Sequence, residues 1–152
     1  MIQRKQTLFL LIAVIAAVVC LCLPLGEFVS GHVMGGKSVM YNLWIARPDG
    51  SHDFSVWALF AILLVTCPIS LFAIFSYKNR ITQSRFCMFN ILLLLGWYFV
   101  LAAMTLKTDG MGGSFNVSMA SALPAVSIIL HFMARKAILA DEALVRSADR
   151  IR

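Results

Sequence analysis

Four long stretches of this chain contain no Asp, Glu, Lys or Arg. They are residues 6–26, 54–77, 86–106 and 110–134. A helix needs about 20 predominantly apolar residues to cross roughly 30 Å of hydrocarbon at about 1.5 Å per residue. Each stretch meets that length, so the sequence predicts four transmembrane helices. Their expected bounds are residues 7–25, 54–77, 86–106 and 115–133.

The overall composition agrees with a membrane environment. Of the 152 residues, 61% are apolar and 13% are charged, against about 45–50% and about 25% in an ordinary soluble domain. A small soluble domain leaves too much surface in water to bury that excess. The composition excludes a soluble enzyme, a coiled coil and a disordered tail. We predict an all-α membrane protein: a four-transmembrane-helix bundle over residues 1–134, followed by a cytoplasmic helical tail over residues 135–152.

The first apolar stretch shares one feature with a secretory signal peptide, because Arg4 and Lys5 precede it. However, the stretch is long for such a signal, and residues 24–28 lack the small-x-small pattern of a cleavage site. Residues 18–20 also match a lipoprotein signal poorly, since valine stands where a small residue is required. We therefore expect an uncleaved first span.

The basic residues predict how the chain is threaded. Ten of the 13 basic residues lie in the N-terminus, in the connection between the second and third spans, or in the C-terminal tail. The other three are Lys37, Arg47 and Lys107. Lys and Arg are retained on the cytoplasmic side of a membrane. Both termini are therefore expected in the cytoplasm, with the protein in the inner membrane. The net charge of +6 fits contact with anionic lipid, and we expect no nucleic acid partner.

The loop over residues 26–53 is expected on the opposite side of the membrane. Residues 39–45 form a β-prone run after a Gly-Gly turn signal, and residues 28–30 or 32–34 could supply a partner strand. We predict a small β-hairpin there, ended by the turn at residues 47–50. Residues 110–114, which are rich in glycine, are expected as a flexible turn between the third and fourth spans.

Residues 31–38 satisfy the phosphate-loop pattern GxxxxGKS. That pattern binds phosphate only when a buried strand enters the loop and a helix leaves it, so that backbone N–H groups point at the ligand. Here the loop follows a membrane helix on the side that lacks nucleoside triphosphates, and a β-prone run follows it. We interpret the match as coincidental and expect no cofactor.

Cysteine and histidine also suggest no metal or catalytic centre. Cys20 and Cys22 point to different sides of a helix, and we interpret these two, with Cys67 and Cys87, as small buried apolar residues. His131 is the only histidine within a predicted span. It stands one turn before Arg135, so we expect it at the headgroup level or bonded to its own helix. No catalytic, cofactor-binding or metal-binding residue is predicted.

Prolines and small residues are expected to shape the bundle. Pro68 and Pro124 lie within the second and fourth predicted spans and are expected to kink them. A stripe of small residues in the fourth span would let another helix approach closely, either in the bundle or in a partner. The stripe comprises Ser114, Ser118, Ser121, Ala122 and Ala125. Among the aromatic residues, Trp57 and Tyr77 are expected at span ends, and Trp97 within the bundle.

The tail after Ala134 contains no glycine or proline and is rich in helix formers. Its apolar residues recur at helical spacing, and Glu142 and Arg146 can pair one turn apart. That apolar stripe comprises Ala137, Ala140, Leu144, Ala148 and Ile151. We predict that the fourth helix continues into the cytoplasm as an amphipathic helix, which either lies on anionic headgroups or docks onto a partner. The candidate partner-binding residues are Asp141, Glu142, Leu144, Val145, Arg146, Asp149, Arg150 and Arg152.

Both ends of the chain resemble a known family. Residues 1–8 (MIQRKQTL), the apolar span ending at Leu23-Pro24-Leu25, and residues 141–152 (DEALVRSADRIR) are similar to a membrane family of the Bacteroidota, domain of unknown function 4293. The resemblance implies a four-span inner-membrane protein of a Gram-negative cell. It implies no established activity and no family active site.

Two functional hypotheses remain open. The first is a non-enzymatic accessory or scaffold subunit of a membrane complex, with membrane lipids and another membrane or cytoplasmic protein as partners. The second is a small transporter or channel formed by oligomerisation, which uses the two proline sites and the polar residues Asn116, Ser121 and His131. An enzyme is least favoured, because acid–base chemistry needs positioned titratable groups that the predicted spans lack.

Overall fold

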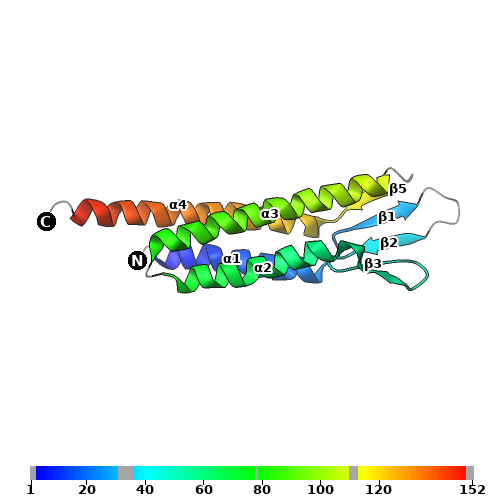
Figure 1. The fold of residues 1–152 in the computed structure, drawn as a ribbon, viewed down its shortest axis with the longest axis horizontal. Coiled ribbons are helices and arrows are strands. Elements are labelled where there is room, and N and C mark those ends of the chain that lie inside the picture. The colour runs from blue at the N-terminus through cyan, green and yellow to red at the C-terminus, as the bar shows by residue number, and fades with distance from the viewer. Residues whose placement is uncertain (1–2, 31–35, 78, 110–112, 150–152) are drawn as a thin grey trace.

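The computed structural model describes the whole chain except residues 1–2, 31–35, 78, 110–112 and 150–152. The described part is an elongated bundle of four helices with a small sheet at one end (Figure 1). The helices are α1 (Gln3–Cys22), α2 (Trp57–Phe75), α3 (Arg80–Asp109) and α4 (Leu123–Asp149), with short 3-10 helices η1 (Phe54–Val56) and η2 (Met119–Ala122). The strands are β1 (Gly26–Ser30), β2 (Lys37–Met40), β3 (Ile45–Ala46), β4 (His52–Asp53) and β5 (Gly113–Val117).

The helices form a bundle in which α1 and α3 each pack against both α2 and α4. Two groups of buried apolar side chains fill its interior. The larger group, toward the sheet, includes Cys20, Leu25, Met40, Leu59, Leu63, Leu94 and Trp97. The smaller group comprises Leu10, Ala73, Cys87, Ala134 and Ile138. The start of α1 and the C-terminal part of α4 both lie at the end opposite the sheet, where α4 extends beyond the other helices (Figure 1).

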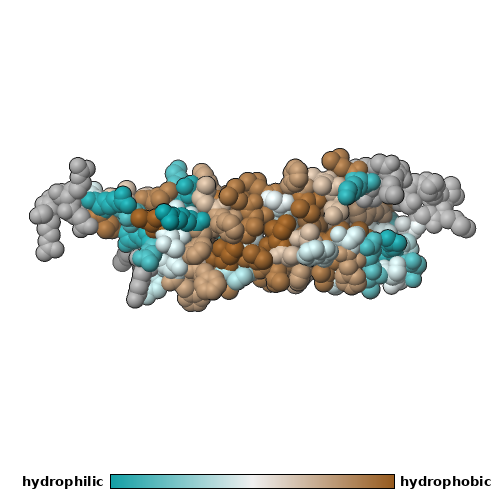
Figure 2. All heavy atoms as spheres, in the orientation of Figure 1, coloured by the Kyte–Doolittle hydropathy of each residue, from teal (hydrophilic) through white to brown (hydrophobic). Residues whose placement is uncertain are grey.

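Three segments are long and apolar enough to cross a membrane: Phe54–Phe75, Arg80–Lys107 and Met119–Ala148. Large apolar side chains on these segments are exposed, among them Phe72, Phe75 and Phe99. The visible face accordingly carries an apolar belt in the middle with hydrophilic residues toward both ends (Figure 2). Exposed apolar surface of this extent is what a lipid environment requires.

The first helix differs from its predicted bounds. Its apolar part, Gln6–Cys22, is shorter than the other three segments, and residues 23–25, expected inside the span, lie beyond α1. The helix ends here because Pro24 lacks an amide hydrogen and disfavours helical geometry at the residue before it. Residue Leu25 instead donates its amide to the Met40 carbonyl at 2.7 Å, which begins the connection to the sheet.

The sheet is antiparallel, with strand order β4-β3-β2-β1-β5. The predicted hairpin is present as β1 and β2, with Phe28 opposite Ser38. The expected strand over residues 39–45 is interrupted, however, because residues 41–44 turn and the Tyr41 amide bonds to the Trp44 carbonyl at 2.8 Å. The alternative partner at residues 32–34 lies outside the described residues.

The fifth strand was not predicted, and it corrects the expected start of the fourth span. Residues 115–117, expected as helix, belong to β5, where Phe28 of β1 stands opposite Phe115. Gly26 permits this pairing, since a Cβ there would lie 2.5 Å from the Asn116 carbonyl oxygen. Of the glycine-rich segment expected as a flexible turn, residues 113–114 are also strand, and residues 110–112 lie outside the described part.

Pro68 and Pro124 occupy different positions in their helices. Pro68 lies inside α2, as predicted. Pro124 lies in the first turn of α4, where a backbone N–H has no partner within the helix, so the expected mid-helix kink is wrong. The predicted small-residue stripe is also divided, because Ser114 lies in β5 and Ser118 precedes η2, while Ala125 lies in α4.

Candidate functional site

The tail helix places the candidate docking residues in three different situations. Helix α4 continues without interruption to Asp149, as predicted. Asp141 is engaged within the chain, because its Oδ2 lies 3.2 Å from Nη1 of Arg80 on α3. Glu142 and Arg146 form the predicted pair one turn apart, with Arg146 Nε 3.1 Å from Glu142 Oε1.

Two apolar members of that set lie free of the bundle. Leu144 is 59% exposed and Val145 is 41% exposed. Upstream, α4 instead buries His131, Ala134 and Ile138 against the other helices. The side chain of Asp149, and the residues Arg150 and Arg152, lie outside the described part. Of the candidate docking residues, Leu144 and Val145 therefore supply accessible apolar surface.

A cluster of polar side chains lies inside the bundle, where α2, α3 and α4 meet. Oγ of Ser70 and Nδ2 of Asn90 lie 3.0 Å and 3.2 Å from Nε2 of His131, and Asn90 Nδ2 also donates to Ser70 Oγ at 2.7 Å. Nδ1 of His131 lies 2.7 Å from the Ser127 carbonyl oxygen. Because a carbonyl only accepts, Nδ1 donates, and Nε2 of the neutral ring is the acceptor.

This cluster corrects one interpretation of His131 and confirms another. The ring is 2% exposed, so it is enclosed by the bundle and does not extend outward to the headgroups, but it does bond to its own helix. Ser127 also connects α4 to α1, because its hydroxyl donates to the Ala13 carbonyl of α1 at 3.1 Å. No member of the cluster is Asp, Glu, Lys or Arg. Its chemistry is that of hydrogen bonds between packed helices in an apolar interior.

The residues that motivated a transport hypothesis do not meet. Asn116 is exposed in β5, Ser121 bonds through its hydroxyl to the Ser118 carbonyl at 2.7 Å, and His131 lies within the polar cluster. They therefore lie in a strand, a 3-10 helix and the middle of α4. The arrangement gives no shared polar path among these three residues.

The four cysteines differ in how far they are buried. Cys20 and Cys87 are buried and Cys67 is half-buried, but Cys22 is exposed, so the expectation of burial is wrong for that residue. Cys22 lies on the far side of α1 from Cys20 because two residues turn a helix by about 200°.

Lys37 and Ser38 of the phosphate-loop pattern lie in β2, so a strand follows the loop where phosphate binding needs a helix.

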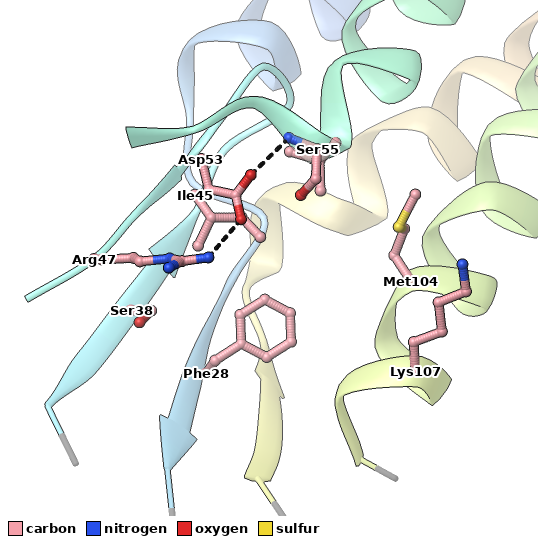
Figure 3. A pocket seen from close by; sticks show the side chains of 9 residues that line it. Phe28, Ser38, Ile45, Arg47, Asp53, Ser55, Met104 and Lys107 are labelled. Carbon is pink, nitrogen blue, oxygen red and sulfur yellow. Dashed lines mark hydrogen bonds and ion pairs between the residues drawn. The ribbon is translucent and has the colours of Figure 1, made fainter. Parts of the chain in front are cut away.

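A pocket that the sequence reasoning missed opens between the sheet and the end of α3 (Figure 3). Its volume is about 550 Å³, within the range of about 300–1,000 Å³ of small-molecule sites. Phe28, Ile45, Val56 and Met104 form apolar walls, and Arg47, Asp53, Lys107, Ser38 and Ser55 supply polar groups. Such a lining suits a small amphipathic molecule. The only sign of this pocket in the sequence was that Arg47 and Lys107 lie apart from the regions that hold most of the basic residues.

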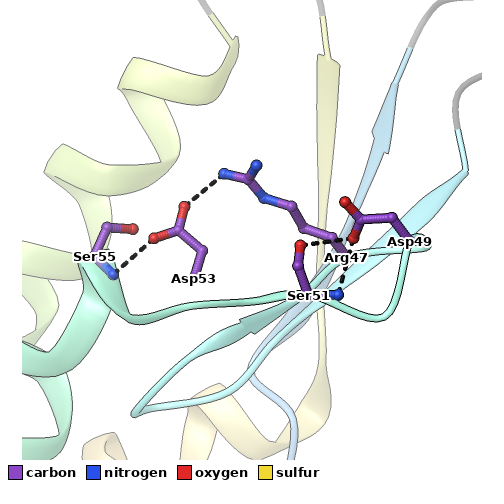
Figure 4. A network of polar contacts seen from close by, with 5 residues as sticks. All are labelled: Arg47, Asp49, Ser51, Asp53 and Ser55. Atoms are coloured by element: carbon purple, nitrogen blue, oxygen red, sulfur yellow. Dashed lines mark hydrogen bonds and ion pairs between the residues drawn. The ribbon is translucent and has the colours of Figure 1, made fainter.

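One wall of this pocket is held by a network of polar contacts (Figure 4). Asp53 accepts from Nη2 of Arg47 at 2.7 Å through Oδ2 and from the Ser55 amide at 3.0 Å through Oδ1, which caps η1. Next to it, Asp49 accepts from the amide and hydroxyl of Ser51 at 2.9 Å and 2.6 Å. The Ser55 amide, and then Arg47, hold the pKa of Asp53 below its ordinary value of 3.8.

This pKa makes the stability of the sheet end depend on pH. Because the folded-state pKa of Asp53 is lowered, its stabilising effect is fully present above pH 3.8 and is lost as the pH falls through the folded-state pKa. The effect is expected to be small, because solvent screens the partly exposed Arg47–Asp53 pair. Thermal unfolding of the purified protein should show a smaller loss of Tm on acidification for Asp53→Asn than for the wild type. The control Asn116→Ala, at an exposed and uncharged residue of the same sheet, should lose as much Tm as the wild type; equal curves for all three proteins would contradict the prediction.

Residues 2–151 match a family model described as a domain of unknown function, DUF4293. No curated protein matches the chain. Among the described residues, no group of three or more His, Cys, Asp or Glu side chains is placed to hold a metal ion.

Proposed function

Since this chain belongs to the DUF4293 family, whose function is unknown, we propose a function from its own architecture: a non-enzymatic accessory or scaffold subunit of a membrane complex. We place it as a four-span protein in the inner membrane of a Gram-negative bacterium of the Bacteroidota, with both termini cytoplasmic. The last turns of α4 dock a partner protein.

The packing of α1 supports a fourth span. The apolar part of α1, Gln6–Cys22, extends roughly 25 Å at about 1.5 Å per residue, which is at the short end of what a transmembrane helix needs. It lies beside α2 and α4 within the bundle (Figure 1). Its outward side chains, such as Leu11, Ile15 and Val19, are apolar and exposed. Arg4 and Lys5 at its start favour the cytoplasm for that end.

The observation that carries the docking proposal is the extension of α4 beyond the other three helices (Figure 1). This extension bears the exposed Leu144 and Val145 beside the Glu142–Arg146 pair. It follows the long axis of the bundle, so it points away from the membrane rather than along its surface. A protein partner therefore fits the extension better than a lipid surface.

Replacing Leu144 by arginine tests this proposal without shortening the chain. Truncation after Ala140 is less clean, because it also removes Asp141, the partner of Arg80. After crosslinking in native membranes and affinity purification, recovery of a specific partner should fall about tenfold or more, as expected for an apolar interface anchor. Membrane insertion and the Tm should not change.

The matched control is Val117→Arg, which changes an equally exposed apolar residue at the sheet end of the molecule. This variant should recover the same partner in the same amount as the wild type. Unchanged partner recovery with Leu144→Arg would reject docking through the tail. A reporter fused after Arg152 should be active in the cytoplasm, and activity on the opposite side would reject the proposed orientation.

A further inference from the structure

A groove on the outside of the bundle runs between α3 and α4, near the end opposite the sheet. Its volume is about 250 Å³, and its lining comes from two helices. The lining residues are Ser84, Arg85, Met88, Phe89 and Leu92 of α3, and Arg135 of α4. The groove therefore places two arginine residues that are distant in the sequence beside a row of apolar side chains.

The two arginines have positive charge that their surroundings leave available. Neither hydrogen bonds nor ion pairs among the described residues neutralise Arg85 or Arg135, and the groove lining contains no carboxylate. Nε of Arg135 is buried and has no hydrogen-bond partner in the described part of the chain. Arg80, which lies nearby on α3, is paired with Asp141. A buried N–H of a charged group is costly when unpaired, so the groove favours an anion with several acceptor oxygens.

The apolar part of the groove continues from Arg85 toward the middle of the membrane. Met88, Phe89 and Leu92 follow Arg85 at spacings of three, four and seven residues, which places all four on one face of a helix. All three apolar side chains are exposed, and they lie within the apolar segment Arg80–Lys107. The charged groups thus lie near the end of that segment, with the apolar surface at hydrocarbon depth.

We infer that this groove is a binding site for one anionic phospholipid. Arg85 and Arg135 hold the phosphodiester, because guanidinium groups match phosphate oxygens in geometry as well as charge. An acyl chain lies along Met88, Phe89 and Leu92. Basic pockets between helices at the cytoplasmic side of a membrane are the kind of surface that selects anionic headgroups. The inference rests on the membrane orientation proposed above, which puts this end in the cytoplasmic leaflet.

Native mass spectrometry of the purified full chain tests the site. The protein is released from detergent micelles that contain equal amounts of phosphatidylglycerol and phosphatidylcholine. We expect one retained phosphatidylglycerol, and affinity about tenfold weaker in the double variant Arg85→Gln/Arg135→Gln, since each lost contact is a charge-assisted one. Lys136→Gln, which removes an exposed positive charge next to Arg135, is the matched control and should bind as the wild type.

Each other outcome overturns the inference. Equal retention of the two lipids, or unchanged phosphatidylglycerol binding in the double variant, would show that the groove does not select an anionic lipid. Displacement of the lipid by inorganic phosphate at equal concentration would show a simple anion site. If the double variant does not fold, Arg85→Lys/Arg135→Lys retains the charges but not the guanidinium geometry, and it should bind phosphatidylglycerol more weakly than the wild type; binding as tight as that of the wild type would contradict the inference.

The failure of this inference is distinguishable from that of the proposed function. Lipid retention is measured on the purified chain, so it does not depend on any docking partner. A reversed reporter signal after Arg152 would reject the orientation while lipid selectivity stays measurable. A normal topology without lipid selectivity would reject the lipid site alone.

Discussion

Replacing Asn42 by alanine is expected to lower the free energy of unfolding by about 2–4 kcal/mol, because it leaves two buried groups unpaired and removes packed atoms. Asn42 is 0% exposed. Its Nδ2 donates to the Cys20 carbonyl at 2.7 Å, and its Oδ1 accepts from Nε1 of Trp97 at 3.2 Å. The Cys20 carbonyl belongs to the last turn of α1, where no helix amide follows to pair with it. Asn42 therefore joins the turn between β2 and β3 to α1 and α3.

Denaturant unfolding of the protein in detergent micelles, followed by tryptophan fluorescence, measures this loss. The matched control is Asn116→Ala, because Asn116 is an exposed asparagine of the same sheet. That substitution should change the free energy of unfolding by less than about 0.5 kcal/mol, as for an ordinary surface site. Similar small effects of the two substitutions would show that the sheet is not anchored to the bundle through Asn42.

Replacing His131 by alanine is expected to lower the free energy of unfolding by about 2–3 kcal/mol, through a cavity and the loss of interhelical hydrogen bonds. The imidazole lies within hydrogen-bond distance of Ser70 on α2 and Asn90 on α3. Its removal also leaves the Ser127 carbonyl without the Nδ1 donor. The same unfolding experiment measures the effect, and His52→Ala, at an exposed histidine in β4, is the matched control.

The pairing partner within the cluster allows a sharper test. If His131 and Asn90 stabilise the bundle through each other, the double variant His131→Ala/Asn90→Ala loses less than the sum of the two single losses. A coupling of about 0.6 kcal/mol is the average for hydrogen bonds between membrane helices, and about 1.7 kcal/mol is the upper end. Strict additivity, or an effect of His131→Ala no larger than that of His52→Ala, would contradict the assigned contacts.

The positions of the apolar helices were the most predictable part of the fold. The predicted second span, residues 54–77, corresponds to the apolar segment Phe54–Phe75, and the predicted third span lies inside α3. The uninterrupted tail of α4 was also predicted, because no glycine or proline follows Ala134. These features depend on the length and composition of one continuous segment.

The strand β5 could not be predicted from the local sequence. Residues 115–117 are apolar enough to extend a span, and they have the composition of a strand as well. The pairing with β1, in which Gly26 stands opposite Val117, decides between the two. Because helices α2 and α3 separate β1 from β5 in the chain, no local sequence pattern predicts that the two strands pair. The pocket between the sheet and α3 depends on the same assembly.

Sequence alone therefore determined which segments are apolar enough to leave water and how long they are, because the free energy of transfer from water to an apolar environment is nearly a sum over the residues of one segment. Only the tertiary structure decided which polar side chains meet: Asn42 with Trp97, Ser70 and Asn90 with His131, and Arg85 with Arg135 in one groove. Hydrogen bonds and ion pairs act over a few ångströms and in fixed directions. They depend on the rotation and register of helices that are remote in the chain, which no single segment encodes.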